Sequence, residues 1–250
     1  PVHVERLAAL DTDLALTTNG TSLGLIAHDL AAAGLKRINV SLDSLQRDRV
    51  LAITRRDCLD QVIDGIDAAI DAGLSPVKVN AVLVRGVNDD EVVDFATFGR
   101  ERGVSVRFIE FMPLDASGEW TSDKVVARDE IVRTIGEVYS LEPAGEDHTG
   151  PEPAEVFRYA DGKGDFGVIA SVTNAFCDSC DRVRLTADGQ LRSCLFALDE
   201  LDLRALLRGG ATDDDLAAAV ERCVAAKWAG HAVNQVQFIR PNRSMSQIGG

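Results

Sequence analysis

A short segment near the end of the sequence combines residues that can bind a metal with residues that can bind an anion. Cys177 and Cys180 form a C-x-x-C pair, and Cys194 follows a hairpin that we predict over residues 182–196. Two cysteines three positions apart can present both sulfurs to one metal, and the hairpin returns the third sulfur to the same place. We therefore predict a three-thiolate site for zinc or for an iron–sulfur cluster, two alternatives that the spacing leaves open.

No fourth ligand lies near these cysteines in the sequence, since His148, Cys223 and His231 are all distant. A structural zinc site needs a closed set of four ligands. A [4Fe–4S] cluster normally takes four cysteines, so three cysteines leave one iron free for an external ligand. The segment therefore favours a centre with one open coordination position.

Arginines lie in the first arm of the predicted hairpin. Alternation along a strand puts Arg182 and Arg184 on one face with Thr186, and Val183 and Leu185 on the other. A solvated strand face is the commoner place for arginine. Two planar cations this close to a metal thiolate are also suited to hold a phosphate or carboxylate, and we predict that role for them.

Another cation lies in the apolar segment PVKVNAVLV (76–84), where Lys78 and Asn80 alternate with apolar residues. A lysine in a buried parallel strand is costly unless it is paired or faces a polar cavity. The alternative is an edge position from which the ammonium reaches water. Polar or sulfur-containing side chains also lie near the ends of the neighbouring predicted strands: Thr17, Ser41, Asp43, Arg107, Glu110 and Met112. Together these side chains predict a functional rim at the carboxyl ends of the strands.

Alternating strands and helices are predicted to position these residues. Strand patterns cover 13–19, 36–43, 76–84 and 104–112. Helix patterns cover 22–34, 58–73 and 88–103, and Asn88 is the expected N-cap of the last. This order predicts parallel strands with helical crossovers, in an open doubly wound sheet or a (β/α) barrel. No G-x-G-x-x-G follows a strand, which weakens the dinucleotide-binding alternative.

The pattern changes after Pro113. The predicted elements there are a helix over 128–139, a loop over 140–154, two strands within 155–172, the hairpin over 182–196, a capped helix over 212–228 and an irregular tail over 240–250. The hairpin turn is expected at Asp188-Gly189, a dipeptide that suits the required backbone geometry.

The composition limits the classes of partner. The chain has 250 residues, five cysteines and a net charge of -14, which argues against nucleic-acid and anionic-membrane surfaces but allows a small anionic ligand. No run is long enough to span a bilayer and no signal peptide is evident, so we expect a cytosolic location with reduced thiols. The chain starts at Pro1 within a helix-like pattern, and we expect it to be a fragment.

Several motifs occur together in one order: LALTTNG, LKRINVSLD, PVKVNAVLVRGVNDDE, VRFIEFMP, FCDSCDRVRLTADGQLRSCLF and the terminal IGG. On these motifs the chain resembles the molybdenum-cofactor biosynthesis protein A family, the radical S-adenosylmethionine GTP 3',8-cyclases. The resemblance runs from about Leu14 to Gly250.

The resemblance implies an α/β fold, with an incomplete TIM-type (β/α) barrel over 1–125 and a C-terminal α+β region for cluster and GTP binding over 126–250. It also implies two [4Fe–4S] clusters. One binds S-adenosylmethionine and yields a 5'-deoxyadenosyl radical, and the other contacts the guanine of GTP. The expected product is (8S)-3',8-cyclo-7,8-dihydroguanosine 5'-triphosphate, which cyclic pyranopterin monophosphate synthase, a functional partner, consumes. The family also suggests a homodimer.

The resemblance assigns roles to individual residues of this sequence. The ligands of the GTP-contacting cluster would be Cys177, Cys180 and Cys194. The GTP-binding positions would be Thr17, Lys78, Arg107, Arg182, Val183 and Arg184. Ser41 and Met112 would contact S-adenosylmethionine. The catalytic set would be Arg182 and Arg184 with the double-glycine tail, Gly249 and Gly250, which the family inserts into its active site.

One part of the family pattern is absent. The sequence has no C-x-x-x-C-x-x-C, the only cysteine before Cys177 is Cys58, and the Gly-Gly-Glu-Pro segment that binds S-adenosylmethionine is missing. In the family both precede the matching region. We therefore expect these residues to bind the GTP-contacting cluster without generating the radical. The alternatives are a zinc-stabilised, non-catalytic binding module and a truncated pseudo-enzyme that binds GTP.

Overall fold

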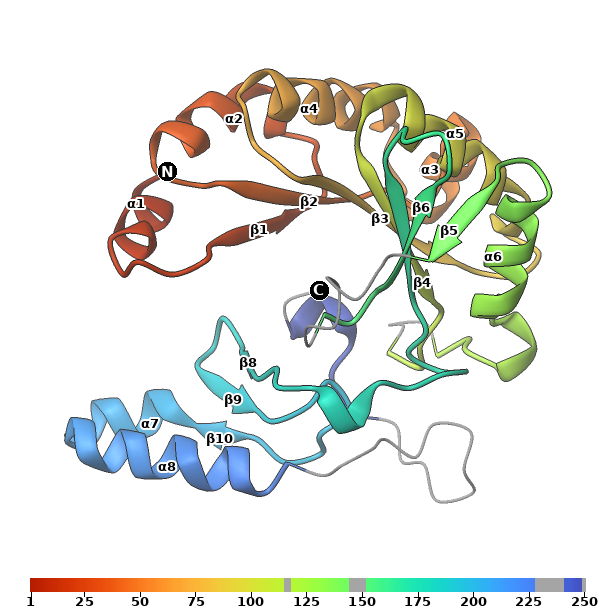
Figure 1. The fold of residues 1–250 in the computed structure, drawn as a ribbon. Helices are drawn as coiled ribbons and strands as arrows, with labels where there is room; N and C mark the ends of the chain where they lie inside the picture. Colours follow the sequence, from red (N-terminus) through yellow and green to blue (C-terminus); the bar gives the residue numbers. More distant parts are fainter. Residues whose placement is uncertain (115–117, 144–151, 228–240, 249–250) are drawn as a thin grey trace. The chain divides into compact units, whose positions relative to one another are not determined.

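The computed structural model describes residues 1–114, 118–143, 152–227 and 241–248. The chain divides into two compact units (Figure 1). The sheet unit consists of Pro1–Phe111 and Asp123–Thr173, and the hairpin unit consists of Met112–Ser122 and Asn174–Gly250. Each unit has its own sheet and is described by itself.

The sheet unit is built on a 7-stranded sheet of order β1-β2-β3-β4-β7-β6-β5. In chain order its strands are β1 Ala15–Thr18, β2 Arg37–Ser41, β3 Val77–Leu83, β4 Ser105–Glu110, β5 Leu141–Pro143, β6 Glu155–Tyr159 and β7 Asp165–Ile169. Strands β1 to β4 and β7 are parallel, while β6 and β5 are antiparallel to their neighbours. The strands predicted before Pro113 and within 155–172 are confirmed. The predicted loop over 140–154 is wrong at its start, where β5 forms.

Helices cover one face of this sheet, on the outer side in Figure 1. They are α2 Leu23–Ala32, α4 Leu59–Asp71, α5 Val92–Arg102 and α6 Arg128–Gly136. The strand residues beneath them form the core and are almost fully buried: Ile38, Val40, Val79, Ala81, Val106, Phe108, Phe166 and Val168. Successive strand residues point to opposite faces, so the other face carries the residues between them.

Two short helices of the sheet unit bury little apolar surface. Helix α1 spans Val2–Ala8, has no buried residue and confirms the helix-like pattern at the start of the sequence, whereas α3 spans Arg47–Thr54, buries only Val50 and was not predicted. Short helices with so little buried apolar surface have no clear apolar stripe in the sequence.

The predicted N-cap role of Asn88 is wrong. A 3-10 turn at Asp89–Glu91 precedes α5, and the Asn88 side chain makes no capping hydrogen bond. Asn88 is buried, and its amide instead accepts from the Val84 N–H at 2.7 Å and donates to the carbonyls of Val82 at 2.8 Å and Asp43 at 2.6 Å. The side chain therefore holds the loop after β3 against the loop after β2.

The hairpin unit contains a 3-stranded sheet of order β10-β9-β8. Its elements are β8 Arg184–Leu185, β9 Gln190–Arg192, β10 Leu201–Asp202, α7 Leu203–Arg208 and α8 Asp213–Ala225. The antiparallel β8–β9 pair confirms the predicted hairpin, and Gly189 supplies the positive φ of +85° in its turn. Thr212 and Asp215 form a capping box at α8, which confirms that this helix is capped.

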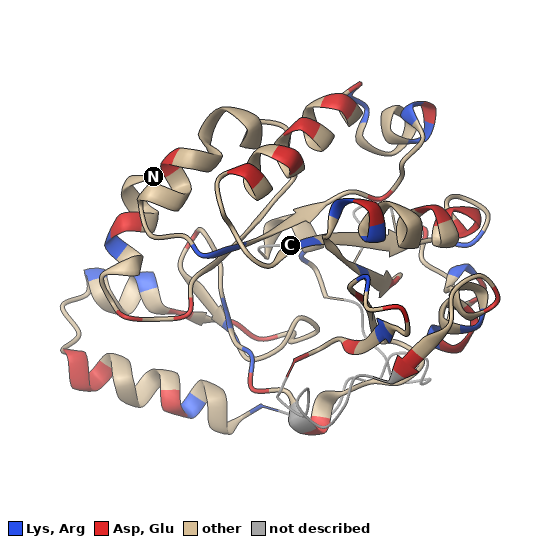
Figure 2. Ribbon diagram, turned by 45° about the horizontal axis from the view of Figure 1, so that its top comes forward, with Lys and Arg blue, Asp and Glu red and all other residues tan. Residues whose placement is uncertain are grey.

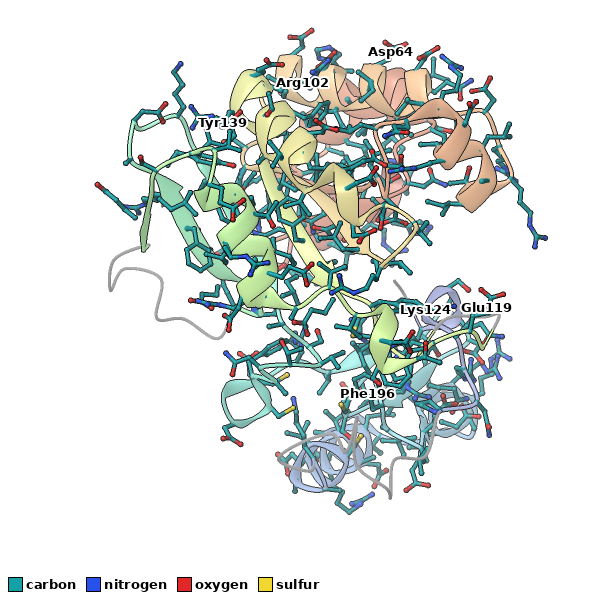
Figure 3. All side chains as sticks on the ribbon, turned by 90° about the vertical axis from the view of Figure 1, so that its right-hand side faces the viewer. Asp64, Arg102, Glu119, Lys124, Tyr139 and Phe196 are labelled. Atoms are coloured by element: carbon teal, nitrogen blue, oxygen red, sulfur yellow. The ribbon has the colours of Figure 1, made fainter. Side chains whose placement is uncertain are left out.

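Acidic residues are frequent along the helices of the sheet unit, as the red segments of the ribbon in Figure 2 show. Helix α4 exposes Asp60, Asp64, Asp67 and Asp71, and Asp64 and Arg102 project outward in Figure 3. Arg102 pairs with Asp67 at 3.3 Å. In the described part of the chain, no helix has the length and apolar character required to span a membrane.

Candidate cluster and anion site

The parallel register brings the sequence-predicted polar residues of the sheet unit onto one face. Thr17 pairs with Asn39 and Asn39 with Lys78 across β1, β2 and β3. Two residues further along β3, Asn80 pairs with Arg107 of β4. We call the face formed by the following residues the polar face: Thr17, Asn39, Ser41, Lys78, Asn80, Ser105, Arg107, Asp165 and Gly167. It lies opposite the apolar core, so β3 is apolar on one side and polar on the other.

Arg107 is the most enclosed cation on the polar face. Its side chain is 7% exposed and forms an ion pair with Asp165 across Nη1 and Oδ1 at 3.0 Å. Nη1 also donates to the Ser105 hydroxyl, which donates in turn to Asp165. These contacts fix one end of the guanidinium at the start of β7.

Gly167 makes room for this arrangement. It pairs with Arg107 between β4 and β7, and the Arg107 side chain lies across it. A Cβ atom on residue 167 would come within 2.8 Å of Arg107 Cδ and 3.0 Å of Nε. Real Cβ atoms do not pack that closely, so any larger residue would displace the arginine.

Lys78 is half-buried on the polar face, as its position in β3 predicts. Burial lowers the pKa of Lys78, and the positive charge of Arg107 lowers it further. Lys78 forms no ion pair with any residue that the structure describes. Thr17, two strands away, is exposed and accepts a hydrogen bond from Asn39 Nδ2 at 3.2 Å. The carboxylates of Glu152 and Asp165 act in the opposite direction on the pKa of Lys78, whereas Arg37, on the same face of β2, lowers it.

The remaining strand-end residues are not all available to a ligand. Ser41 is exposed at the end of β2. Asp43 accepts from the Val82 N–H at 2.8 Å, and burial raises the pKa of its carboxyl. Met112 is half-buried and belongs to the hairpin unit, whereas Ser41 belongs to the sheet unit. The structure describes these two residues within separate units.

Glu110 ends β4, at the predicted position near a strand end, but its carboxylate is not available to a ligand. Glu110 is fully buried and accepts from the N–H groups of Arg128 at 3.1 Å, Val172 at 2.8 Å and Thr173 at 2.8 Å. It also accepts from the Thr173 hydroxyl. Both carboxylate oxygens are therefore engaged in joining β4 to the start of α6 and to the segment after β7.

In the hairpin unit, Cys180 lies among hydrogen-bond donors. Cys177 begins a 3-10 turn, and the Cys180 N–H donates to the Cys177 carbonyl at 3.2 Å. The Cys180 Sγ accepts from Arg182 Nε at 3.3 Å and Lys227 Nζ at 3.5 Å. Burial alone would raise the pKa of Cys180, but the hydrogen bonds from Arg182 and the charges of Arg182 and Lys227 outweigh it and lower that pKa.

Cys194 lies in a turn that a buried arginine supports. The Phe196 N–H donates to the Cys194 Sγ at 3.5 Å, and Phe196 is labelled in Figure 3. Arg192, whose side chain is 2% exposed, pairs with Glu200 through Nη1 and donates from Nη2 to the carbonyls of Leu195, at 3.3 Å, and Ala197. Arg192 Nε has no hydrogen-bond partner among the described residues. Arg192 thus positions the turn that carries the third cysteine.

The predicted alternation in the first hairpin arm is confirmed, and its burial is the reverse of an ordinary surface strand. Arg182 and Arg184 are half-buried and Thr186 is buried, whereas Val183 is 43% exposed and Leu185 is 63% exposed. Burial lowers the pKa of Arg184, and Arg182 lowers it further, while Cys194 and Cys180 act in the opposite direction. Arg184 therefore lies within electrostatic range of two of the three cysteines.

The C-terminal tail packs on the same hairpin. Arg184 Nη1 donates to the carbonyl of the buried Ile248 at 3.4 Å. Arg243 pairs with Asp188 at 2.9 Å and with Glu200 at 2.8 Å. Gly249 and Gly250, which the resemblance assigns to catalysis, lie outside the described residues.

The donor chemistry around the cysteines fits an iron–sulfur cluster. Cations and N–H donors near a ligand sulfur stabilise the thiolate form, and Cys180 and Cys194 have both. Within the described ranges, no group of three or more His, Cys, Asp or Glu side chains is arranged to hold a single metal ion. A four-iron cluster is larger than one ion, so its ligand sulfurs are spread more widely.

Sequence reasoning missed several residues of these two sites. Lys227 lies far from Cys180 in the sequence, and only the fold brings it to the sulfur. Asp165 and Ser105 form the partners of Arg107. A sequence pattern for Ser105 does exist, because it alternates with apolar residues in the same register as Arg107. Lys227 and Arg192 have no comparable local pattern.

Comparison with protein families gives two matches that follow one another along the chain. The Radical SAM superfamily matches residues 2–99, and Molybdenum Cofactor Synthesis C matches residues 104–233.

Curated relatives match over nearly the whole chain. The GTP 3',8-cyclase 2 of Mycobacterium bovis is 50% identical over 242 residues, which cover 95% of this chain and 67% of the relative. The GTP 3',8-cyclase of Mycolicibacterium smegmatis is 48% identical and covers 99% of this chain and 71% of the relative. The corresponding Streptomyces coelicolor protein is 46% identical, with 99% and 73% covered. The chain thus spans about two thirds of the length of these relatives.

Solved structures give more distant matches. A radical SAM methyltransferase from Sphaerobacter thermophilus has a TM-score of 0.39 and 20% sequence identity, over 49% of this chain and 36% of that chain. The coproporphyrinogen III oxidase of Escherichia coli, a radical SAM enzyme, has a TM-score of 0.41 and 12% identity, over 54% of this chain and 35% of that chain.

Proposed function

The chain belongs to the GTP 3',8-cyclase family of molybdenum-cofactor synthesis, a family of radical SAM enzymes, and on this premise we propose that the protein converts GTP to (8S)-3',8-cyclo-7,8-dihydroguanosine 5'-triphosphate. The reaction would use a 5'-deoxyadenosyl radical. The fold agrees with this assignment at the level of an α/β radical SAM protein with a parallel sheet. We further propose that the sheet is part of an incomplete barrel.

The burial pattern of the first hairpin arm, residues 182–186, is the observation that carries the proposal for GTP. This arm exposes Val183 and Leu185 and half-buries Arg182 and Arg184, which lowers stability because guanidinium groups lose hydration when buried. An anion beside the cysteines would offset this loss of hydration by pairing with the two arginines. A triphosphate with about four negative charges would pair with them through charge-assisted hydrogen bonds.

The polar face supplies the other residues proposed to contact GTP. Lys78 and Arg107 would pair with phosphate oxygens, and the Thr17 hydroxyl would donate or accept a hydrogen bond. In the hairpin unit, Val183 would contribute through its backbone between the two arginines. The lowered pKa of Lys78 supports this assignment, since a polyanion would relieve the repulsion from Arg107.

We propose Ser41 and Met112 as contacts for S-adenosylmethionine. Exposure of Ser41 at the carboxyl end of β2 is compatible with that role. The tail residues Gly249 and Gly250 remain proposed catalytic residues together with Arg182 and Arg184. The hydrogen bond from Arg184 to the Ile248 carbonyl supports this grouping, because it holds the last described residue of the tail against the hairpin.

Cys177, Cys180 and Cys194 are proposed to hold the GTP-contacting [4Fe–4S] cluster, whose open iron would bind the guanine base. We propose that residues 1–125 form the partial barrel, which also contributes the GTP contacts Thr17, Lys78 and Arg107, and that residues 126–250 hold the cluster and the remaining GTP contacts. A C-x-x-x-C-x-x-C motif for the S-adenosylmethionine cluster is not among the 250 residues. We therefore propose that these residues alone bind GTP without forming the radical.

The first test measures metal content and the response to GTP. The 250-residue chain, purified without oxygen, is expected to contain iron and sulfide, and its cluster EPR spectrum should change when GTP is added. Arg184→Met should weaken this response at least about tenfold in GTP concentration, because a charge-assisted pair is lost. Arg208→Met at the end of α7 is the matched control and should respond like the unchanged chain.

Two results would redirect the interpretation. Stoichiometric zinc with no iron would contradict the proposal and favour a zinc-stabilised binding module. GTP binding without turnover, in a natural protein that lacks the C-x-x-x-C-x-x-C segment, would favour a truncated pseudo-enzyme. Cyclic pyranopterin monophosphate synthase as functional partner, a homodimer and a cytosolic location remain predictions of the family resemblance.

A further inference from the structure

Lys227 lies next to the proposed cluster site but has no role in the assignments above. It is half-buried just after the end of α8, and its N–H donates to the Val224 carbonyl at 2.9 Å. Its ammonium makes two hydrogen bonds to one loop. It donates to the Arg182 carbonyl at 2.7 Å and to the Cys180 Sγ at 3.5 Å.

These contacts tie α8 to the segment that carries both a cysteine and an arginine. The Arg182 side chain reaches back to the same sulfur, with Nε 3.3 Å from the Cys180 Sγ. It also lies over the Phe176 ring at 4.9 Å, which restrains its direction. Cys180 is therefore a sulfur that receives hydrogen bonds from two cationic side chains.

Hydrogen bonds and positive charge at a ligand sulfur change the energetics of an iron–sulfur cluster. The reduced cluster carries one more negative charge than the oxidised cluster, so a nearby cation stabilises the reduced form more. Groups outside the ligand set also orient the ligands themselves. An ammonium held by the Arg182 carbonyl meets both conditions, because that carbonyl fixes where the charge lies.

We infer that Lys227 is a positioning residue of the cluster: its ammonium fixes the loop from Cys180 to Arg182 and raises the reduction potential of the cluster through the Cys180 sulfur. This inference rests on the proposed iron–sulfur function. The ligands themselves remain the cysteines, and Lys227 acts through one of them.

The test compares Lys227→Met with Lys227→Arg in the oxygen-free protein. Iron and sulfide are quantified first, and the reduction potential is then measured by a redox titration followed by EPR. We expect Lys227→Met to keep its iron and to shift the potential to a more negative value. Lys227→Arg retains a donor and a positive charge, and should restore the potential toward that of the unchanged protein.

The matched control is Arg222→Met, which removes one positive charge from the exposed side of α8. It should leave the potential unchanged, because charges in water are screened. If Lys227→Met fails to retain iron, Lys227→Gln provides the neutral variant for the same measurement.

The outcomes separate the inference from the proposed function. An unchanged potential in an iron-loaded Lys227→Met or Lys227→Gln variant would overturn the inference while leaving the cluster assignment intact. A shift of equal size in Arg222→Met would also overturn it, since a general charge effect would then explain the result. Zinc in place of iron in the unchanged protein would instead overturn the proposed function.

Discussion

Lys78 is a residue whose structural cost suggests a functional reason. It is half-buried in β3, and the structure gives it no carboxylate partner within ion-pair distance among the described residues. Burial and the charge of Arg107 lower its pKa from the ordinary 10.5. Removing the charge should therefore help folding while it harms anion binding.

Lys78→Met should stabilise the sheet unit by about 1 kcal/mol or less at neutral pH and weaken GTP binding at least about tenfold. The free energy of unfolding of the unchanged protein should rise as the pH increases toward 10.5. The reason is that the pKa of Lys78 is lower in the folded protein, so the unfolded chain keeps the proton to a higher pH. The advantage of the variant should shrink over that window in urea titrations.

Lys36→Met is the control for this experiment, because Lys36 is exposed just before β2. It should alter neither stability nor GTP binding by a measurable amount. An equal loss of GTP binding in both variants would contradict a specific role for Lys78.

Glu110 shows the opposite case, a charged residue whose role is structural. Glu110→Gln replaces one acceptor oxygen by an NH₂ group that faces the N–H donors at residues 128, 172 and 173. We expect a loss of about 2–3 kcal/mol in urea unfolding, the cost of leaving buried donors unsatisfied. Glu130→Gln removes only a partly exposed pair with Arg85 and should cost less than about 1 kcal/mol. Similar losses in the two variants would count against this explanation.

At the scale of secondary-structure elements, α2 and α4 pack closely because a glycine lies at their contact. A Cβ on Gly65 in α4 would come within 2.6 Å of the Gly20 carbonyl oxygen and 3.0 Å of Leu23 Cβ. The first of these atoms belongs to the backbone of the loop after β1. The loop that follows Thr17 is thus held directly by the helix behind it.

Gly65→Ala should destabilise the sheet unit by about 2 kcal/mol, because the steric clash exceeds the gain in helix propensity. Gly136→Ala in α6 is the matched control, since its Cβ would meet only Leu141 Cδ1 at an ordinary 3.7 Å. That variant should be neutral or stabilised by up to about 1 kcal/mol. Thermal unfolding of both variants checks the difference, and stabilisation of both would show that the loop gives way easily.

Secondary-structure elements with a strong local pattern of apolar residues could be predicted from the sequence. Strands β1 to β4 were predictable because apolar residues run through them, and α4 because its apolar residues return every three or four positions. Helix α7 was missed because it is short and largely exposed, and strand β10 because it has only two residues, both half-buried. Asn88 was misassigned because its three hydrogen-bond partners come from the loops after β2 and β3 and from the end of β3, which local sequence cannot reveal.

In the candidate site, too, only the residues with a local sequence pattern could be predicted. Cys177, Cys180, Arg182 and Arg184 lie close together in sequence, so spacing and alternation identified them. The partners of these residues, Lys227 above all, come from distant segments and required the fold.

At the scale of the whole molecule, the two units differ in how much apolar surface they bury. The sheet unit has an extended core between sheet and helices. In the hairpin unit, the described apolar residues that are fully buried are Leu114, Leu191, Ala219 and Ile248. So small a core seldom stabilises a domain, and a bound metal or cluster then contributes folding free energy directly.

Removing the metal centre should therefore unfold the hairpin unit selectively. After chelation, amide hydrogens in β9 and α8 should exchange much faster, whereas those in β3 and β4 should keep their protection. Hydrogen exchange read by mass spectrometry distinguishes these segments within one sample, so the sheet unit serves as the internal control. Unchanged protection in α8 after complete metal loss would show that the hairpin unit folds unaided.

The close approach of Arg107 to Gly167 also bears on the evolution of related chains. The arginine can follow its present path only while the facing residue in β7 has no side chain. A lineage that replaces this glycine must reroute or replace the arginine, and one that loses the arginine frees the glycine to vary. The two positions should therefore be inherited as a pair, and their joint presence in a genome-derived sequence would mark proteins whose polar face keeps the same arrangement of charge.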